Sequence, residues 1–149
     1  MTNGTALQRP ATTTSPDDST TLRVEHRGGD RFDIAVRGHV LHVDQPADAG
    51  GDDFAPTPTE LFVAGLAACV AFYARRYLHR HGLPTEGLAV TTRYELGLRP
   101  ARVTRVDVQL TAPDGLPAER RDALLAVASH CTVHNSLTQP PDVAVAFAD

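Results

Sequence analysis

A long apolar segment with a strong helix start constrains the fold more than any other part of this sequence. Thr57 suits the N-cap position, Pro58 suits the first helical position, and Glu60 completes a capping box. The segment runs to about His81 and ends at Gly82, a typical helix-terminating residue. Its first half is apolar on nearly every side, so one sheet cannot cover it. We expect this helix in the middle of the fold, with a second subunit supplying part of the cover.

Short segments on both sides of this helix alternate apolar and polar residues, the pattern of half-buried strands. They are residues 22–26, 32–36, 40–43, 88–96, 103–110 and a closing strand at 143–147. A second helix is predicted over residues 117–129. Strands grouped on both sides of one apolar helix predict an α+β fold with mostly antiparallel pairing. Residues 1–20 are polar and lack periodicity, which predicts a disordered tail before a single domain at 21–149.

Composition and charge exclude several classes of function. The 149-residue chain has a formal net charge of −4, which gives no reason to expect a nucleic-acid or anionic-membrane partner. Its longest apolar run, residues 61–74, is shorter than the roughly 20 residues that span a bilayer. No secretory signal is visible. Two cysteines without such a signal favour a reducing compartment, so we expect a cytoplasmic protein.

The two cysteines are the residues best suited to carry chemistry. Cys69 lies deep in the apolar helix, and Cys131 lies at the end of the second helix, beside His130 and His134. Their separation excludes a local CxxC redox or zinc motif. The thiols can act together only if the fold brings them together, and that arrangement would suit thiol redox chemistry.

The surroundings of both cysteines resemble one protein family. The segment Pro-Thr-Glu-Leu-x-x-Ala-Gly-Leu-Ala-Ala-Cys (58–69), followed by Cys-x-Val-His-x-Ser-Leu (131–137), resembles the OsmC-like family. This family includes osmotically inducible protein C and the organic hydroperoxide resistance proteins. The resemblance covers roughly residues 21–149. It implies an OsmC-like fold, in which curved, mostly antiparallel sheets wrap around long central helices in an intertwined homodimer.

The resemblance also implies an activity, the reduction of organic or hydrogen peroxides in oxidative stress defence. Cys69 would attack the peroxide, and Cys131 would resolve the product as an intramolecular disulfide. A dithiol reductant, either a small thiol or a lipoyl protein, would then reduce that disulfide. No metal or bound cofactor is implied.

An apolar helix would keep a thiol protonated, so this chemistry needs a cation near Cys69. In the hydroperoxide branch of the family the cation is an Arg of the N-terminal hairpin, and Arg31 and Arg37 are the candidates here. The family's orienting Glu falls at Thr59, whereas the carboxylate of this chain is one step later, at Glu60. Nine residues at about 100° each place Glu60 on the opposite side of the helix from Cys69. The capping box explains Glu60 without catalysis.

Apolar side chains at helical spacings from Cys69 predict a substrate pocket that favours organic peroxides. They are Phe62, Leu66, Phe72 and Tyr73. His134 is predicted to act directly, to cap backbone near Cys131 or to line the pocket. A zinc site around Cys131 is an alternative, but the other histidines are scattered. A second candidate function is a non-catalytic homodimer that binds small apolar ligands.

Overall fold

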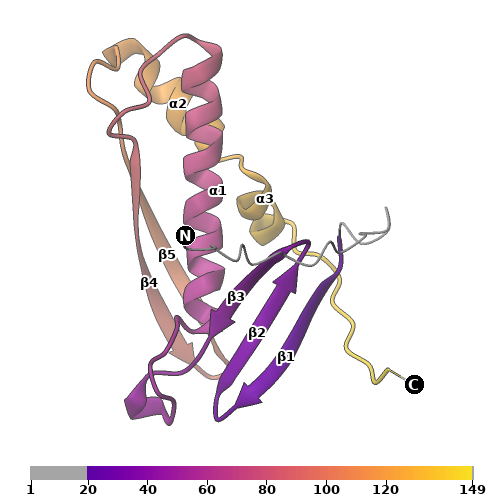
Figure 1. The fold of residues 1–149 in the computed structure, drawn as a ribbon. Coiled ribbons are helices and arrows are strands. Elements are labelled where there is room, and N and C mark those ends of the chain that lie inside the picture. The colour runs from indigo at the N-terminus through magenta and orange to yellow at the C-terminus, as the bar shows by residue number, and fades with distance from the viewer. Residues whose placement is uncertain (1–19, 149) are drawn as a thin grey trace, which may run out of the picture. The chain divides into compact units, whose positions relative to one another are not determined.

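The apolar segment folds into one unbroken helix, α1 (Pro58–Arg80), in the computed structural model, which describes residues 20–148. The predicted helix is therefore confirmed, and Figure 1 shows it running the length of the C-terminal unit. The chain divides into two compact units with the boundary between Pro58 and Thr59. The predicted tail, residues 1–20, lies outside the described residues except for Thr20.

The N-terminal unit is a three-stranded antiparallel sheet. Its strands are β1 (Leu22–Gly28), β2 (Arg31–Val36) and β3 (His39–Val43), in the order β1-β2-β3. Gly28 and Gly29, with φ of 107° and 54°, allow the tight reversal between β1 and β2. The three strands predicted in this half of the chain are confirmed, each within two residues of the expected ends.

A buried carboxylate organises the loop that follows β3. Asp44 is 1% exposed, and its oxygens accept the backbone N–H groups of Gln45, Asp52 and Phe54 at 2.8, 3.2 and 3.0 Å. These hydrogen bonds hold the pKa of Asp44 below its usual value, and the one from Phe54 has the largest effect. Burial alone would raise this pKa. A short 3-10 turn, η2 (Ala47–Ala49), lies within the same loop. The carboxylate of Asp44 thus accepts the backbone hydrogen bonds that a neighbouring strand would accept in a sheet.

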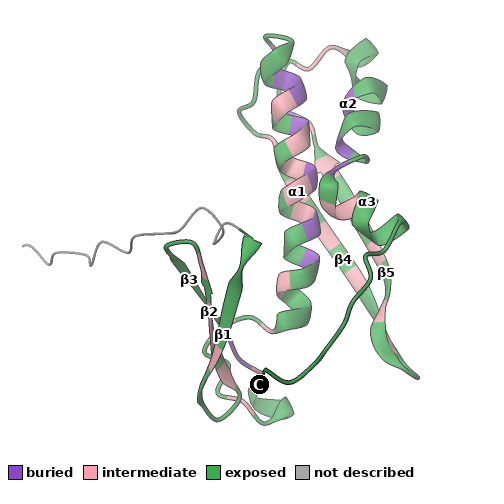
Figure 2. Cartoon of the chain, turned by 90° about the vertical axis from the view of Figure 1, so that its right-hand side faces the viewer, coloured by how far each residue is buried: buried purple, intermediate pink, exposed green. Residues whose placement is uncertain are grey.

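The C-terminal unit packs α1 against a long hairpin and two shorter helices. The hairpin pairs β4 (Ala89–Leu98) with β5 (Ala101–Thr111), and it is followed by η3 (Ala118–Arg120), α2 (Arg121–Ala128) and α3 (Thr132–Thr138). The buried residues gather along α1 and at the end of α2, as Figure 2 shows. The core consists of Leu66, Val70, Ala74, Tyr77, Leu78, Leu124, Ala128 and Cys131. On α1 these residues recur at three- and four-residue spacings, so one face of the helix is buried.

The end of α1 follows the signal in the sequence. Gly82 adopts a left-handed φ of 63°, and the Leu83 N–H donates to the carbonyl oxygen of Leu78 at 2.9 Å. The His81 ring nitrogen Nδ1 contacts the carbonyl oxygen of Tyr77 at 2.8 Å. These contacts satisfy carbonyl groups that would otherwise lack partners at a helix C-terminus.

Two predictions about the C-terminal third were wrong or incomplete. Residues 143–147 do not form a strand, and Val143, Val145 and Phe147 are 82, 95 and 100% exposed. Alternation alone cannot make a strand, because a strand also needs a neighbouring edge to accept its hydrogen bonds. The structure also has helix α3 directly after Cys131, which the sequence patterns did not predict.

The face of α1 away from this core is open in the single chain. Phe62 and Phe72 are 45 and 52% exposed, and Gly65 and Ala68 on the same side are exposed too. The helix is also long and apolar enough, by length and composition alone, to cross a membrane. The core helix of a soluble protein meets the same criteria, and 33% of the most apolar window is already buried inside the protein. The expected burial on every side is therefore not reached within one chain.

The loop around Asp44 gives a test of how the N-terminal unit is held together. A Cβ at Gly51 would overlap the carbonyl oxygen of Gln45 and lie 2.8 Å from Oδ1 of Asp44. Gly51→Ala should therefore destabilise the protein by about 1–3 kcal/mol, the usual cost of overpacking. Gly38→Ala is the matched control, because a Cβ there meets nothing within 4 Å. Thermal unfolding should separate the two variants, and equal melting temperatures would contradict this account of the loop.

Candidate functional site

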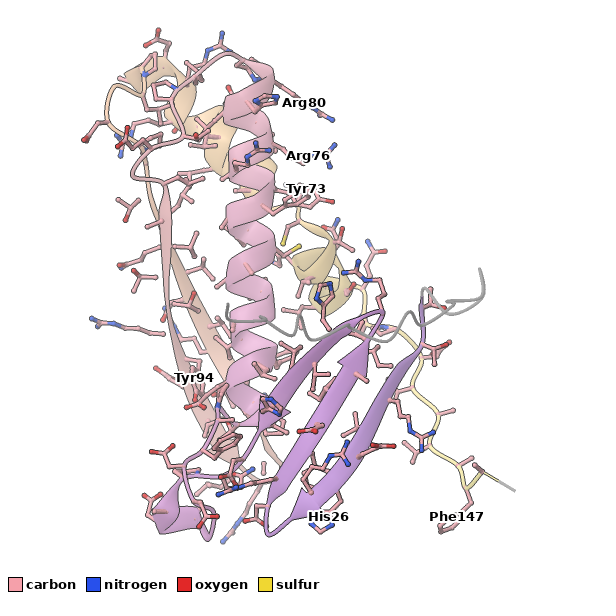
Figure 3. All side chains as sticks on the ribbon, viewed as in Figure 1. His26, Tyr73, Arg76, Arg80, Tyr94 and Phe147 are labelled. Carbon is pink, nitrogen blue, oxygen red and sulfur yellow. The ribbon has the colours of Figure 1, made fainter. Side chains whose placement is uncertain are left out.

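The two cysteines meet inside the C-terminal unit. Cys69 is half-buried on α1, and Cys131 is fully buried between the end of α2 and the start of α3. Cys69 packs against the core cluster that contains Cys131, and the two side chains are hydrogen-bonded. Figure 3 shows the two sulfur atoms together, close to Tyr73. The α2 helix brings Cys131 there, because its buried residues Leu124 and Ala128 dock on α1 about two turns and one turn earlier, respectively.

The environment of Cys131 keeps its thiol neutral. Burial raises the pKa of Cys131, and the hydrogen bond and the charge of Cys69 raise it further. The backbone N–H of His134, which donates to the Cys131 sulfur at 3.4 Å, opposes the rise. A negative charge on Cys69 therefore favours a protonated Cys131.

Tyr73 connects the cysteine pair to the helices around it. It lies one turn after Cys69 on α1, and its hydroxyl is hydrogen-bonded to Oγ1 of Thr132 at 2.9 Å. Thr132 is the first residue of α3 and directly follows Cys131. This hydrogen bond therefore joins the segments that carry the two sulfurs and fixes the position of α3 beside α1.

A mainly apolar cavity of about 210 Å³ lies beside the site. Its walls come from α1, β5, α2 and the start of α3, and its lining residues are Leu66, Val70, Val106, Val108, Leu110, Leu125, Ala128, Ser129 and His134. His134 is half-buried and lines this cavity, while its backbone N–H contacts the Cys131 sulfur. The cavity could accept a small apolar molecule close to the thiols.

The residues predicted to form the substrate pocket differ in burial and do not all line the cavity. Leu66 is buried and lines the cavity, whereas Phe62 and Phe72 are exposed. Tyr73 stands beside the sulfurs, as described above. Glu60 is exposed in the first turn of α1, and the unbroken helix keeps it about half a turn from Cys69.

The predicted activating arginines belong to the N-terminal unit. Arg31 donates from Nη2 to Asp52 at 2.8 Å, and its Nε lies 3.8 Å from Asp44. Its guanidinium also stacks over Phe54, with 4.7 Å from Cζ to the ring centroid. Arg37 is exposed in the hairpin turn between β2 and β3, with a φ of 55°. Arg31, at the start of β2, is therefore held by the loop that follows β3, whereas Arg37 is an exposed turn residue with a strained backbone.

The zinc alternative finds no ligand set in the part of the chain that is described. Among residues 20–148, no three or more His, Cys, Asp or Glu side chains are grouped so that they could hold a metal ion. The ring Nδ1 of His130 instead contacts the carbonyl oxygen of Ala126 at 2.7 Å. This contact is typical of a histidine at a helix C-terminus.

Sequence reasoning missed two structural parts of the site. The first is α3, whose N-cap is Cys131 itself, because cysteine is not among the usual capping residues. The apolar pair Val133 and Leu137, four residues apart, was the available signal. The second is the contact between Tyr73 and Thr132, which joins residues too distant in sequence for any local pattern to reveal.

A long helix that carries one cysteine and buries one face, with a second cysteine docked against it by a following helix, defines an α+β protein with a paired-thiol site. The family model of OsmC-like proteins matches residues 50–146, which include both cysteines. The chain belongs to the OsmC-like family. The resemblance and the α+β, OsmC-like fold class expected from the sequence are thus confirmed, whereas the intertwined homodimer stays a prediction.

Solved structures support the same fold. A proposed osmotic stress induced and detoxification response protein of Psychrobacter arcticus matches with a TM-score of 0.73 and 23% identity, over 78% of this chain and 87% of that one. An organic hydroperoxide resistance protein of Legionella pneumophila, described as a predicted redox protein, matches with a TM-score of 0.58 and 26% identity, over 78 and 88%. A third, from Elizabethkingia anophelis, has a TM-score of 0.62 and 21% identity, over 80 and 89%. None of the curated proteins matches the chain.

Proposed function

We propose that this protein is a thiol-dependent peroxidase that reduces organic hydroperoxides through Cys69 and Cys131. The observation that carries the proposal is the hydrogen-bonded pair of free cysteines inside the C-terminal unit. Its family includes solved structures named organic hydroperoxide resistance proteins, which indicates a role in peroxide resistance. Membership of the family does not by itself establish peroxidase activity, so the proposed function depends on the reactions of these two thiols.

The reaction takes two steps that balance in atoms and electrons. The Cys69 thiolate attacks the terminal oxygen of the hydroperoxide, the O–O bond breaks, and the alkoxide leaves as an alcohol after taking a proton. Cys69 is then a sulfenic acid. The Cys131 thiolate attacks its sulfur, a disulfide forms, and the hydroxyl leaves as water. An external dithiol reduces the disulfide by exchange and is itself oxidised.

The geometry supports distinct roles for the two cysteines. Cys69 is the more accessible sulfur, and an attacking thiol must meet its substrate. Cys131 is fully buried and kept neutral, so it is protected until a sulfenic acid forms beside it. The cation that activates Cys69 is assigned to the N-terminal hairpin, to Arg31 first and to Arg37 second. His134 is assigned to the wall of the substrate cavity.

The apolar cavity favours one other candidate function, the binding of a small apolar ligand without catalysis. The cavity beside the thiols is lined chiefly by aliphatic side chains such as Leu66, Val70 and Val108. Such a pocket can hold a ligand by burial of apolar surface alone. The two functions differ in one respect, since only the peroxidase consumes both thiols when a hydroperoxide is added.

The fate of the two thiols tests the proposal directly. The reduced protein, treated with a slight excess of cumene hydroperoxide, should lose both free thiols and about two hydrogens in mass as the disulfide forms. Cys69→Ser should abolish the reaction, whereas Cys131→Ser should accumulate a sulfenic or overoxidised Cys69. Mass spectrometry and thiol titration give the readout. A wild-type protein that keeps both thiols would leave the ligand-binding function in place.

The same assay sorts the supporting residues. Arg31→Gln and Arg37→Gln should slow the first step without changing the second, because the guanidinium that activates Cys69 is assigned to these residues.

Hydrogen peroxide should react more slowly than cumene hydroperoxide, because it gains nothing from an apolar cavity. Equal rates would contradict the role assigned to the cavity.

The raised pKa of Cys131 predicts how the second step depends on pH. Only the thiolate attacks, and burial keeps the pKa of Cys131 raised even after Cys69 loses its charge. Disulfide formation should therefore accelerate by about tenfold per pH unit through the neutral and mildly alkaline range, until that pKa is reached. Stopped-flow mixing with one equivalent of hydroperoxide measures the rate. His134→Gln is the control, since loss of the pH dependence in that variant would assign the titration to the imidazole instead.

We also propose that two copies of the chain pair through the open face of α1. Phe62 and Phe72 are exposed there, and the exposed Gly65 and Ala68 between them would let a second helix approach closely. Light scattering should give twice the chain mass of 16.0 kDa. Phe72→Glu should shift the protein toward monomer, whereas Leu98→Glu, at an 86% exposed position of the β4–β5 hairpin, should not. A monomeric wild-type protein would refute the pairing.

A further inference from the structure

A second concave surface of the C-terminal unit combines aromatic rings with basic groups. This groove, of about 400 Å³, lies where the last turns of α1 meet α2. It is lined by Tyr73, Arg76, Tyr77, Arg80, His81 and Val127. We call it the basic groove. Figure 3 labels Tyr73, Arg76 and Arg80, which follow one another in successive turns of α1.

The two arginines of the basic groove form no ion pair with any described residue. Within residues 20–148, no carboxylate pairs with Arg76 or Arg80, although other arginines of the chain do form ion pairs. Arg76 instead packs over two rings, with its Cζ 5.6 Å from the Phe72 centroid and 5.8 Å from the Tyr73 centroid. Its guanidinium is thus placed by stacking while its N–H donors stay available.

A purely structural explanation accounts for only part of this arrangement. Cations at a helix C-terminus are stabilised by the helix dipole, and Arg80 in the last turn fits that explanation. Arg76 lies a full turn earlier, where the dipole effect has faded, and it leans on the rings. The imidazole of His81 stacks on Tyr77 at 4.2 Å and adds a third basic group to the same wall. Five basic or aromatic side chains therefore line one groove, and the helix dipole accounts only for those in the last turn of α1.

The basic groove is connected to the cysteine pair through Tyr73. Its ring forms one end of the groove, while its hydroxyl contacts Thr132 beside Cys131. Arg76 and Arg80 lie seven and eleven residues after Cys69, which is about 10 and 16 Å along the helix axis. A ligand anchored at these guanidinium groups could therefore reach the sulfurs with an apolar chain of medium length.

We propose that the basic groove binds the carboxylate of an apolar ligand through Arg76 and Arg80, and that its chain extends over Tyr77 and Tyr73 toward Cys69. Guanidinium groups are well matched to carboxylates, because paired N–H donors meet paired oxygens. The aromatic floor covers the apolar chain. Resting on the peroxidase function proposed above, the groove makes hydroperoxides that carry a carboxylate the preferred substrates.

Binding of an unreactive probe tests the groove independently of catalysis. Calorimetric titration with decanoate and with decanol should show tighter binding of decanoate. Arg76→Gln and Arg80→Gln should each weaken decanoate binding by about tenfold and leave decanol unchanged, because a charge-assisted hydrogen bond is lost. Arg75→Gln is the matched control, since it removes the same charge from an exposed neighbouring position outside the groove.

The outcomes separate the groove from general electrostatics and from the reaction. Equal binding of decanoate and decanol would overturn the proposal, and so would an equal loss in Arg75→Gln. Circular dichroism confirms that each variant is folded, and Arg80→Gln decides the case if Arg76→Gln is unstable. In the kinetic arm, the kcat/KM ratio for a fatty-acid hydroperoxide over its methyl ester should fall in both groove variants. Selective decanoate binding without peroxide consumption would uphold the groove and reject the peroxidase.

Discussion

Cys131 is buried because α2 docks on α1 through a narrow row of side chains. Leu124 and Ala128 lie four residues apart and are each 1% exposed, and Cys131 continues the row at the point where the helix has ended. The chain then turns directly into α3, whose first N–H groups face the sulfur. The position of the second thiol is therefore a consequence of core packing, and any change that loosens α2 from α1 would separate the two sulfurs.

This packing sets up an electrostatic conflict that the proposed chemistry uses. Taking a thiol out of water favours its neutral form, and the raised pKa of Cys131 expresses that cost. A resolving cysteine can tolerate the cost, because it acts only after its partner has been oxidised. An attacking cysteine cannot, which is consistent with Cys69 being the more exposed of the two. The difference in burial thus suits one thiol to attack the peroxide and the other to resolve the product.

Local patterns predicted most of the secondary structure. The capping signal at Thr57 to Glu60 and the glycine at position 82 bounded α1 within one residue, and five strands were found from alternation. The prediction failed at residues 143–147, where alternation is present but the segment pairs with neither of the two described sheets. It also missed α3, because a cysteine N-cap carries no recognisable signal. The strand at 143–147 was wrong because pairing depends on a partner strand, and α3 was missed because its N-cap residue is unusual. Neither error comes from the intrinsic helix or strand propensity of the residues.

The sequence by itself determined the helix, the strands, the family and the two cysteines that stand out within them. Only the tertiary structure decided that these cysteines are neighbours, that Tyr73 links them to α3, and that Arg76 and Arg80 share a groove with aromatic rings. The reason is physical. Propensity and periodicity act over a few residues, whereas the meeting of residues 69 and 131 depends on how α2 packs against a helix that ends some forty residues before it begins.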